Sequence, residues 1–191
     1  MYIGGVGMSG LHHLIWEVVD NAVDEAMNGH ASEISVTLHK DGRTITVSDN
    51  GRGIPIDKHP KTKKSALETV LTVLHAGGKF DGNNYKTAGG LHGVGASVVN
   101  ALSSELVVTI KRDGKVHRIT FAGGEKTSDL EVIDSCGKRN TGTRIHFWPE
   151  KKYFDSINFS VPRLKHVLRA KAVLCPGLEV SFLEEKTGEK Q

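Results

Sequence analysis

The sequence predicts an α+β fold, a two-layer sandwich in which one mixed, mostly antiparallel sheet carries helices on one face. Three observations lead to this prediction. An amphipathic segment lies near the start, paired runs of alternating apolar and polar residues follow around turns, and further helical segments separate those strands. With 191 residues and 38% hydrophobic composition, the chain is long enough for one well-buried core, so we expect a single domain over 1–191.

The first element is a helix over 11–28, because its apolar residues recur on one broad arc at about 100° per residue. Gly29 is a natural stop. The opposite face carries Glu17, Asn21 and Asp24, and residues 1–39 contain neither Lys nor Arg to pair with its acids along the helix. A solvated surface face explains such a pattern in most helices. A binding face is the alternative, and the rest of the chain favours it.

Strands and helices then alternate along the chain. Runs over 34–38 and 44–48 form a hairpin, and Ser65 with Glu68 has the spacing of a capping box for a helix that ends at Gly77 and Gly78. Four further strands are expected over 105–111, 116–121, 143–148 and 178–183, with a helix over 162–175 before the last of them.

Composition excludes several classes of protein. The net charge of +3 is too small to indicate nucleic-acid binding by itself, and no apolar run approaches the ~20 residues that cross a bilayer. The two cysteines, Cys136 and Cys175, form no CxxC pair, which argues against a zinc site and a disulfide framework. We therefore expect a cytoplasmic protein without a membrane partner.

Glycine clusters indicate a phosphate site. Seven glycines lie between Gly77 and Gly95, and this loop opens onto a helix start, where unpaired N–H groups and the helix dipole favour an anion. The Walker pattern GxxxxGK[ST] is absent, so a P-loop is not expected. A flexible loop that only needs positive φ explains the same glycines, and this alternative stays open.

Two further features supply chemistry. Asp49 stands at a strand end before Gly51 and Gly53, where a carboxylate can accept from an amino group such as that of adenine, although an aspartate at such a place is, taken alone, more often a turn cap. On the first helix, the Asn21 amide oxygen suits Mg²⁺, and Glu17, one turn earlier, suits a general base that activates water.

The segments EVVDN (17–21), DNGRG (49–53) and GGLHGVG (89–95) resemble the three motifs of the ATPase superfamily shared by gyrase, heat-shock chaperones, histidine kinases and MutL. Over essentially the whole chain, the sequence is similar to the N-terminal ATPase domain of bacterial type IIA topoisomerase B subunits. The segments CGKRNTGT and KAVLCPGLEVSF favour the topoisomerase IV branch over gyrase.

The resemblance implies a role for each matching position. Glu17 is the general base, Asn21 the Mg²⁺ ligand, Asp49 the acceptor for the adenine amino group, and Thr143 a contact near adenine through water. Arg52 pairs with Glu25 at the pocket rim, and Arg112 is a position that coumarin-type inhibitors touch. The ATP-site positions are Asn21, Asp49, Gly53, Ile54, Lys79, Tyr85, Gly90, Leu91, His92, Gly93, Val94, Gly95, Ala96 and Thr143, and the rim positions are Glu25, Arg52, Pro55 and Arg112.

The resemblance also implies a larger assembly. ATP and Mg²⁺ are the expected cofactors, the A subunit of topoisomerase IV or gyrase and DNA are partners of the intact enzyme, and ATP-competitive inhibitors are expected to bind. The N-terminal arm that supports ATP-driven homodimerisation is missing, as are the transducer and DNA-cleavage domains, so we expect a fragment that hydrolyses ATP weakly.

Three alternatives remain open. A gyrase of the same class would use the same pocket for negative supercoiling, and a chaperone or mismatch-repair ATPase would use it for different work. A binding module without enzymatic activity would instead contact nucleic acid through the lysines at 58–64, which are more simply a solvated linker.

Overall fold

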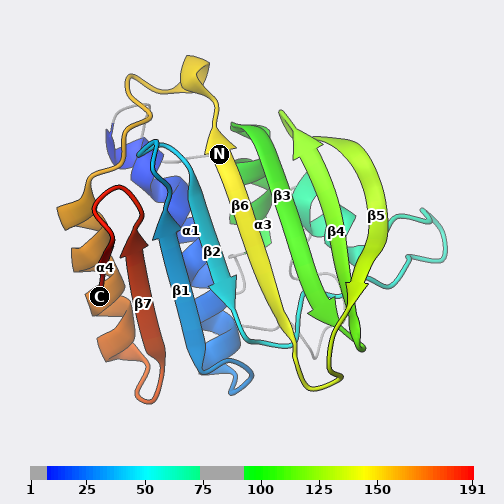
Figure 1. Ribbon diagram of the computed structural model, residues 1–191. Helices are drawn as coiled ribbons and strands as arrows, with labels where there is room; N and C mark the ends of the chain where they lie inside the picture. The colour runs from blue at the N-terminus through cyan, green and yellow to red at the C-terminus, as the bar shows by residue number, and fades with distance from the viewer. Residues whose placement is uncertain (1–7, 74–92) are drawn as a thin grey trace.

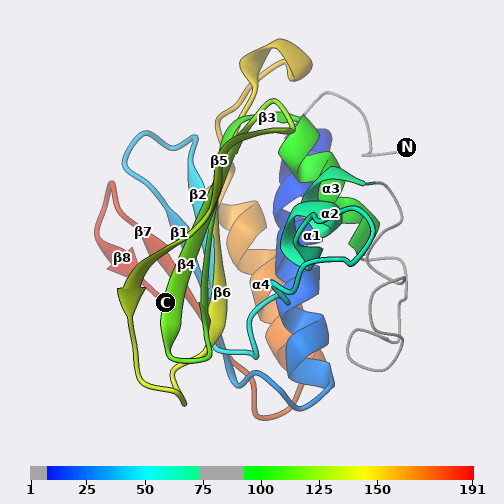
Figure 2. The ribbon, with the colours of Figure 1, turned by 90° about the vertical axis from the view of Figure 1, so that its right-hand side faces the viewer.

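The computed structural model describes residues 8–73 and 93–191, which form one eight-stranded sheet with the helices packed on a single face (Figure 1, Figure 2). The helices are α1 (Met8–Met27), α2 (Ala66–Thr72), α3 (Gly93–Ala101) and α4 (Val161–Leu174), with a 3-10 turn η1 (Lys151–Tyr153). The strands are β1 (Glu33–Leu38), β2 (Ile45–Asp49), β3 (Ser103–Arg112), β4 (Lys115–Ala122), β5 (Glu125–Ser135), β6 (Gly142–Pro149), β7 (Glu179–Glu184) and β8 (Glu189–Lys190).

The sheet is mixed and mostly antiparallel, as the sequence predicts. Its strand order is β5-β4-β3-β6-β2-β1-β7-β8, and the pairing of β1 with β7 is parallel. The β6 strand lies between β3 and β2, so it brings two hairpins that are distant in sequence into one sheet. The predicted α+β class is confirmed.

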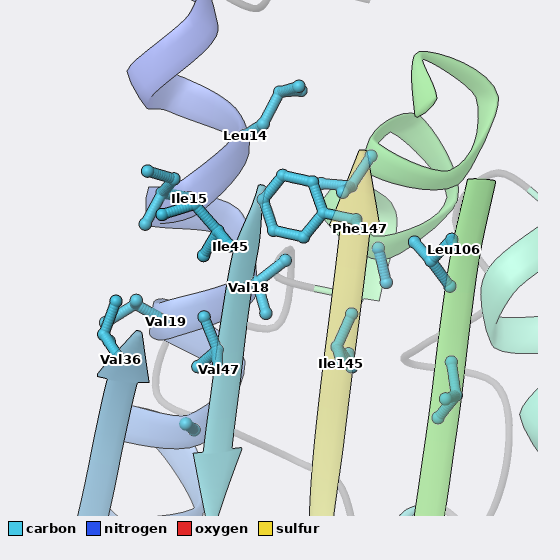
Figure 3. Close-up of a cluster of buried hydrophobic side chains, with 14 of the residues drawn as sticks. Leu14, Ile15, Val18, Val19, Val36, Ile45, Val47, Leu106, Ile145 and Phe147 are labelled. Atoms are coloured by element: carbon cyan, nitrogen blue, oxygen red, sulfur yellow. The ribbon is translucent and has the colours of Figure 1, made fainter. Parts of the chain in front are cut away.

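The core lies between the sheet and α1. The apolar arc of α1, including Leu14, Ile15 and Val19, is almost completely buried. Figure 3 shows these side chains facing Val36, Ile45 and Phe147 of the central strands. Because burial of one such aliphatic side chain contributes about 1.5–3 kcal/mol, this contact is what fixes α1 against the sheet.

The ends of α1 follow local signals. The helix begins at Met8, three residues before the predicted start, and its last residue is Met27. Gly29 adopts φ +80° and donates its N–H to the Ala26 carbonyl at 3.0 Å, which closes the helix end as predicted.

One predicted helix ends earlier than expected, and the strands β5 and β8 were not predicted. The Ser65 hydroxyl accepts from the Glu68 N–H at 3.1 Å, so the predicted N-cap at Ser65 is present, but α2 ends at Thr72 rather than at Gly77. Val73 already has extended dihedrals, φ −112° and ψ 125°. The long strand β5 has no counterpart in the prediction, because almost every residue in it is exposed and apolar alternation is therefore absent.

The acids of α1 find cations from other elements. Lys171 of α4 contacts Asp20 at 2.7 Å, and Arg52 contacts Glu25 at 2.7 Å. Asp24, expected on an open polar face, is only 8% exposed. The shortage of cations along the helix is therefore compensated by tertiary contacts that sequence spacing does not reveal.

Within residues 8–73 and 93–191, none of the helices is both long and apolar enough to span a bilayer.

Candidate nucleotide site

One face of α1 presents three polar side chains, each a helical turn after the last. Glu17, Asn21 and Glu25 are spaced by four residues, so they rise along the helix in steps of about 6 Å. This row runs from the start of α3 at one end to the turn after β2 at the other, as the contacts of Glu17 and Glu25 show.

Glu17 marks the end of the row beside α3. A Cβ on Gly95, in the first turn of α3, would overlap the Glu17 carboxylate, so only glycine permits this approach of the two helices. The Glu17 side chain keeps 26% of its surface exposed, which leaves it accessible to water. The start of α3, with its N–H groups, therefore lies next to an accessible carboxylate.

His13 also belongs to this end of the site, and the sequence-based prediction missed it. Its Nε2 lies 3.5 Å from Glu17 Oε1, one turn earlier on α1. The spacing of four residues between His13 and Glu17 was the available signal, because side chains at i and i+4 share a helix face.

Asp49 marks the other end of the row. It is the last residue of β2, and its Oδ1 accepts the Gly51 N–H at 2.8 Å. A Cβ on Gly51 would lie 2.6 Å from Glu25 Oε2 and 3.0 Å from Asp49 Oδ1, so glycine lets the two carboxylates share this space. Burial raises the pKa of the Asp49 carboxyl to about 6, and the charge of Glu25 adds to the rise.

Arg52 neutralises Glu25, and the predicted ion pair is present. The guanidinium NH2 lies 2.7 Å from Glu25 Oε1, and the Arg52 backbone N–H donates to Oε2 at 3.0 Å. The Glu25 side chain is only 10% exposed, so removing the arginine would leave a nearly buried charge unpaired. This pair fixes the turn after β2 to α1.

Thr143 borders the Asp49 end of the row from the neighbouring strand β6. It pairs with Asp49 across the β2–β6 ladder, and its hydroxyl accepts the Ile54 N–H at 3.1 Å. Gly142 precedes it, and a Cβ there would overlap the Asp49 carbonyl oxygen. The hydroxyl proton of Thr143 remains available to donate to another group.

Arg112 holds the far side of the same turn. Its guanidinium NH1 donates to the Gly53 carbonyl at 2.8 Å. Gly53 has φ +82°, and a Cβ on it would lie 2.9 Å from the Ile110 side chain. Ile54 and Pro55 follow, both partly buried. The turn is thus anchored to α1 by Arg52 and to β3 by Arg112.

The structure therefore unites Glu17, Asn21, Glu25, Asp49, Arg52, Gly53, Ile54, Thr143 and Arg112 along α1, the turn after β2 and the adjoining strand ends. Gly93 and Val94 open α3, and Gly95 and Ala96 continue its first turn. The predicted positions Lys79, Tyr85, Gly90, Leu91 and His92 lie outside the described residues.

The residues present suit a magnesium ion that arrives with a phosphate ligand. Asn21 offers one neutral oxygen between Glu17 and Glu25, and Mg²⁺ commonly takes one or two protein oxygens together with waters and phosphates. In the described part of the chain, no cluster of three or more His, Cys, Asp or Glu side chains is arranged to hold a metal alone.

Comparison with known families agrees with this geometry. Residues 8–152 match the family described as histidine kinase-, DNA gyrase B- and HSP90-like ATPases. The chain belongs to this ATPase family. The first two predicted motifs lie on α1 and on the turn after β2, and the described residues of the third, 93–95, open α3.

Several relatives within the ATPase family are close. The chain is 60% identical over 179 residues to the B subunit of DNA topoisomerase 4 from Pseudomonas aeruginosa, covering 94% of this chain and 28% of the relative. It is 52% identical to the B subunit of DNA gyrase from Thermotoga maritima, covering 100% of this chain and 30% of the relative. The chain thus spans less than a third of the length of these curated relatives.

Two solved structures share the fold. The topoisomerase IV ATP-binding domain of Francisella tularensis, in complex with a small-molecule inhibitor, matches with a TM-score of 0.83 and 49% identity, covering 94% of this chain and 84% of that one. The 43K ATPase domain of Thermus thermophilus gyrase B, in complex with an aminocoumarin, matches with a TM-score of 0.87 and 44% identity, covering 100% of this chain and 48% of that one.

Proposed function

We propose that this chain is the ATP-binding and hydrolysing domain of a topoisomerase IV B subunit, which in the intact enzyme drives ATP-dependent passage of one DNA duplex through another. The observation that carries the proposal is the polar row of α1, which ends at Glu17 beside the α3 start and at Glu25 beside Asp49. Such a row suits a ligand with phosphates at one end and a base at the other.

The base end recognises adenine. The Asp49 carboxylate accepts a hydrogen bond from the exocyclic amino group, and the Thr143 hydroxyl contacts the ring nitrogen side through water. Because the Gly51 N–H already occupies one lone pair of Asp49 Oδ1 at 2.8 Å, the carboxylate is held in one orientation before the ligand arrives.

The phosphate end uses the backbone. The N–H groups of Gly93, Val94, Gly95 and Ala96 are the first of α3 and have no partner within the helix, so they favour the negative phosphates. Lys79, Tyr85, Gly90, Leu91 and His92 are proposed to complete the site from the preceding segment.

Glu17 acts as the general base. Its partly exposed carboxylate takes a proton from a water that attacks the terminal phosphate, a role worth about 10²- to 10⁴-fold in rate. His13, at 3.5 Å, orients that carboxylate and is a positioning residue. Mg²⁺, bound through Asn21, supplies charge neutralisation at the phosphates when present.

The proposal extends to the assembly of the intact enzyme, which is proposed to resemble that of its topoisomerase relatives. A partner A subunit supplies DNA cleavage, and ATP binding promotes homodimerisation when an N-terminal arm is present, because contacts that form only around the triphosphate favour the closed state. The domain boundaries 1–191 are part of this proposal. Small-molecule inhibitors are proposed to compete with ATP at the rim of Glu25, Arg52, Pro55 and Arg112.

The corresponding domain of a gyrase is the second candidate, since gyrase relatives are 51–52% identical to the chain. The two candidates share the pocket and differ in the reaction of the holoenzyme. Decatenation without negative supercoiling, measured with the full-length protein and its A subunit, favours topoisomerase IV, and negative supercoiling favours gyrase.

Calorimetric titration with a non-hydrolysable ATP analogue and Mg²⁺ tests the site. Asp49→Ala and Asn21→Ala should each weaken binding by about tenfold or more, because each removes a group that contacts ligand or metal. The matched controls Asp155→Ala and Asn140→Ala change exposed residues of the same types and should bind like the wild type. Unchanged affinity in both site variants would overturn the proposal.

Glu17→Gln separates binding from chemistry. The amide keeps the shape of the side chain but cannot take a proton, so steady-state ATP hydrolysis should fall about 10²-fold or more while analogue affinity changes little. Hydrolysis that persists at the wild-type rate would contradict the assignment of Glu17 as the base.

A further inference from the structure

The β3–β4 turn and the 136–141 loop lie at the same end of the sheet (Figure 1). Several cations of the sequence fall at this corner, next to the face of the sheet without helices. We call this cluster the cationic corner. It consists of Lys111, Arg118 and Arg144 on the open face of the strands, together with Lys138 and Arg139 in the adjoining loop, and none of these residues belongs to the nucleotide site.

Strand register brings three of these cations together. Thr109 of β3 pairs with Arg144 of β6 on one side and with Arg118 of β4 on the other, so the two arginines stand in one row on the open face. Two strand spacings place their Cα atoms about 10 Å apart. Lys111 points to the same face, two residues and about 7 Å further along β3.

The loop after β5 adds to this row. The Cys136 N–H donates to the Gly114 carbonyl at 2.9 Å, and a Cβ on Gly114 would lie 3.5 Å from Lys138 Cγ. Lys138 therefore lies beside the β3–β4 turn, to which Gly114 belongs. Cations from two separate parts of the chain share one surface.

The acids in this region do not cancel the charge. Glu131 lies 3.7 Å from Arg118 with both side chains about half exposed, and Asp113 lies 3.8 Å from Arg112. Asp134 is the remaining acid. Among the described residues, four members of the cationic corner take part in no ion pair: Lys111, Lys138, Arg139 and Arg144.

Positive and negative side chains are unevenly distributed across the open face. A groove of about 660 Å³ hollows this face, with Lys111, Arg118 and Arg144 beside the single acid Asp134 on one side and Glu33 and Glu179 of β1 and β7 on the other. Asp49 also lines the groove, at the end of β2 between the two sides. A polyanion is therefore attracted to the corner and repelled from the β1–β7 side, which limits where it can lie.

We propose that the cationic corner binds the phosphate backbone of duplex DNA. Its width of about 10 Å matches about three phosphates of one strand, which follow one another every 3.4 Å along the axis. The choice of DNA among polyanions rests on the proposed topoisomerase function. The inference goes further, because it places a duplex contact on the ATPase domain itself, on the face opposite its nucleotide.

Fluorescence anisotropy with a labelled 20-base-pair duplex tests the inference on this chain. Charge reversal at Arg118→Glu, Lys138→Glu and Arg144→Glu should weaken binding by about tenfold or more at ~50 mM salt and reduce the slope of log K against log salt by about 2–3. A matched control reverses Lys40, Lys151 and Lys152 to Glu, at the opposite end of β6, and should stay within about threefold of the wild type.

Nucleotide affinity, measured on the same samples, keeps the two proposals apart and reports correct folding. A wild type that binds nucleotide but no duplex overturns this inference and leaves the ATPase proposal standing, whereas failure to bind nucleotide rejects the proposed function. Equal weakening in both triple variants, or tighter binding of a polyglutamate peptide than of the duplex, also overturns it.

Discussion

At the scale of a single residue, the proposed binding role of Asp49 and its buried position favour opposite protonation states. Its carboxylate is the stronger hydrogen-bond acceptor when ionised, yet burial and the neighbouring Glu25 raise its pKa from 3.8 to about 6. A raised pKa means that the folded state holds this proton more tightly than the unfolded chain. The contribution of Asp49 to stability is therefore present at low pH and is lost as the pH rises through about 6.

The variant Asp49→Asn tests this conflict. At pH 7.5 it should raise the free energy of unfolding by about 1–3 kcal/mol, because it removes a buried charge while keeping the shape, and it should weaken nucleotide binding about tenfold or more. Urea unfolding at pH 7.5 and at pH 4.5 measures the first effect. The gain should shrink at pH 4.5, where wild-type Asp49 is protonated, and a gain of equal size at both pH values would contradict the argument.

Wild-type nucleotide binding should follow the same titration. In the proposed binding mode adenine donates to the Asp49 carboxylate, which accepts more strongly when ionised. Affinity for a non-hydrolysable ATP analogue should therefore fall as the pH drops below about 6, the value to which burial raises the pKa of Asp49. Calorimetry between pH 5 and 8 checks this. Affinity that is flat across the range would show that Asp49 is not the acceptor.

At the scale of elements, the helices are joined by buried polar contacts as well as by the core. Asn100 of α3 is completely buried, and its amide donates to the Leu71 carbonyl at 2.9 Å and to the Gly124 carbonyl at 3.5 Å. One side chain thereby fixes the end of α2 and the β4–β5 turn to α3. The start of α3 is where the phosphates are proposed to bind, so Asn100 supports that site from behind.

Asn100→Ala should destabilise the fold by about 2–4 kcal/mol, since it leaves the buried Leu71 carbonyl without its donor and opens a small cavity. The exposed Asn140→Ala is the matched control and should stay within about 0.5 kcal/mol of the wild type. Urea unfolding curves measure both. A cost for Asn100→Ala no larger than that of the control would show that the contact does not hold the helices.

At the scale of the whole molecule, the site joins distant parts of the chain. Its residues come from α1, from the turn after β2, from the start of α3, from the end of β3 and from the start of β6, and β6 supplies the strand that connects the two hairpins. A ligand that bridges these parts is expected to stabilise the fold as a unit.

Thermal unfolding tests this bridging. At about 100 times its Kd, ATP with Mg²⁺ should stabilise the chain by about 2.7 kcal/mol and raise Tm by about 5–10 °C. Replacing Mg²⁺ by EDTA should remove a large part of the shift for ATP, because the metal acts at the phosphates. The shift for AMP, which lacks the β- and γ-phosphates, should be insensitive to EDTA, and an equally insensitive ATP shift would argue against a metal at Asn21.

Much of the fold follows from sequence patterns. The apolar arc of α1, the hairpin of β1 and β2 and the N-cap at Ser65 were predictable, because each depends on periodicity or on spacing between near neighbours. The strand β5 was not, because it is an exposed edge strand held by its partner rather than by burial of alternate side chains. The end of α2 at Thr72 was not predictable either, because the sequence after Thr72 continues with residues that favour a helix.

The sequence by itself determined which side chains were available for the site. Glu17, Asn21 and Glu25 lie four residues apart, so they share one face of α1. Asp49 is followed by Gly51 and Gly53, which end the strand β2. Tertiary structure alone decided which of them meet. Arg52 and Glu25 are 27 residues apart, Arg112 and Gly53 are 59 apart, and Thr143 reaches Ile54 across 89. Such contacts depend on strand order and packing, which no local pattern encodes.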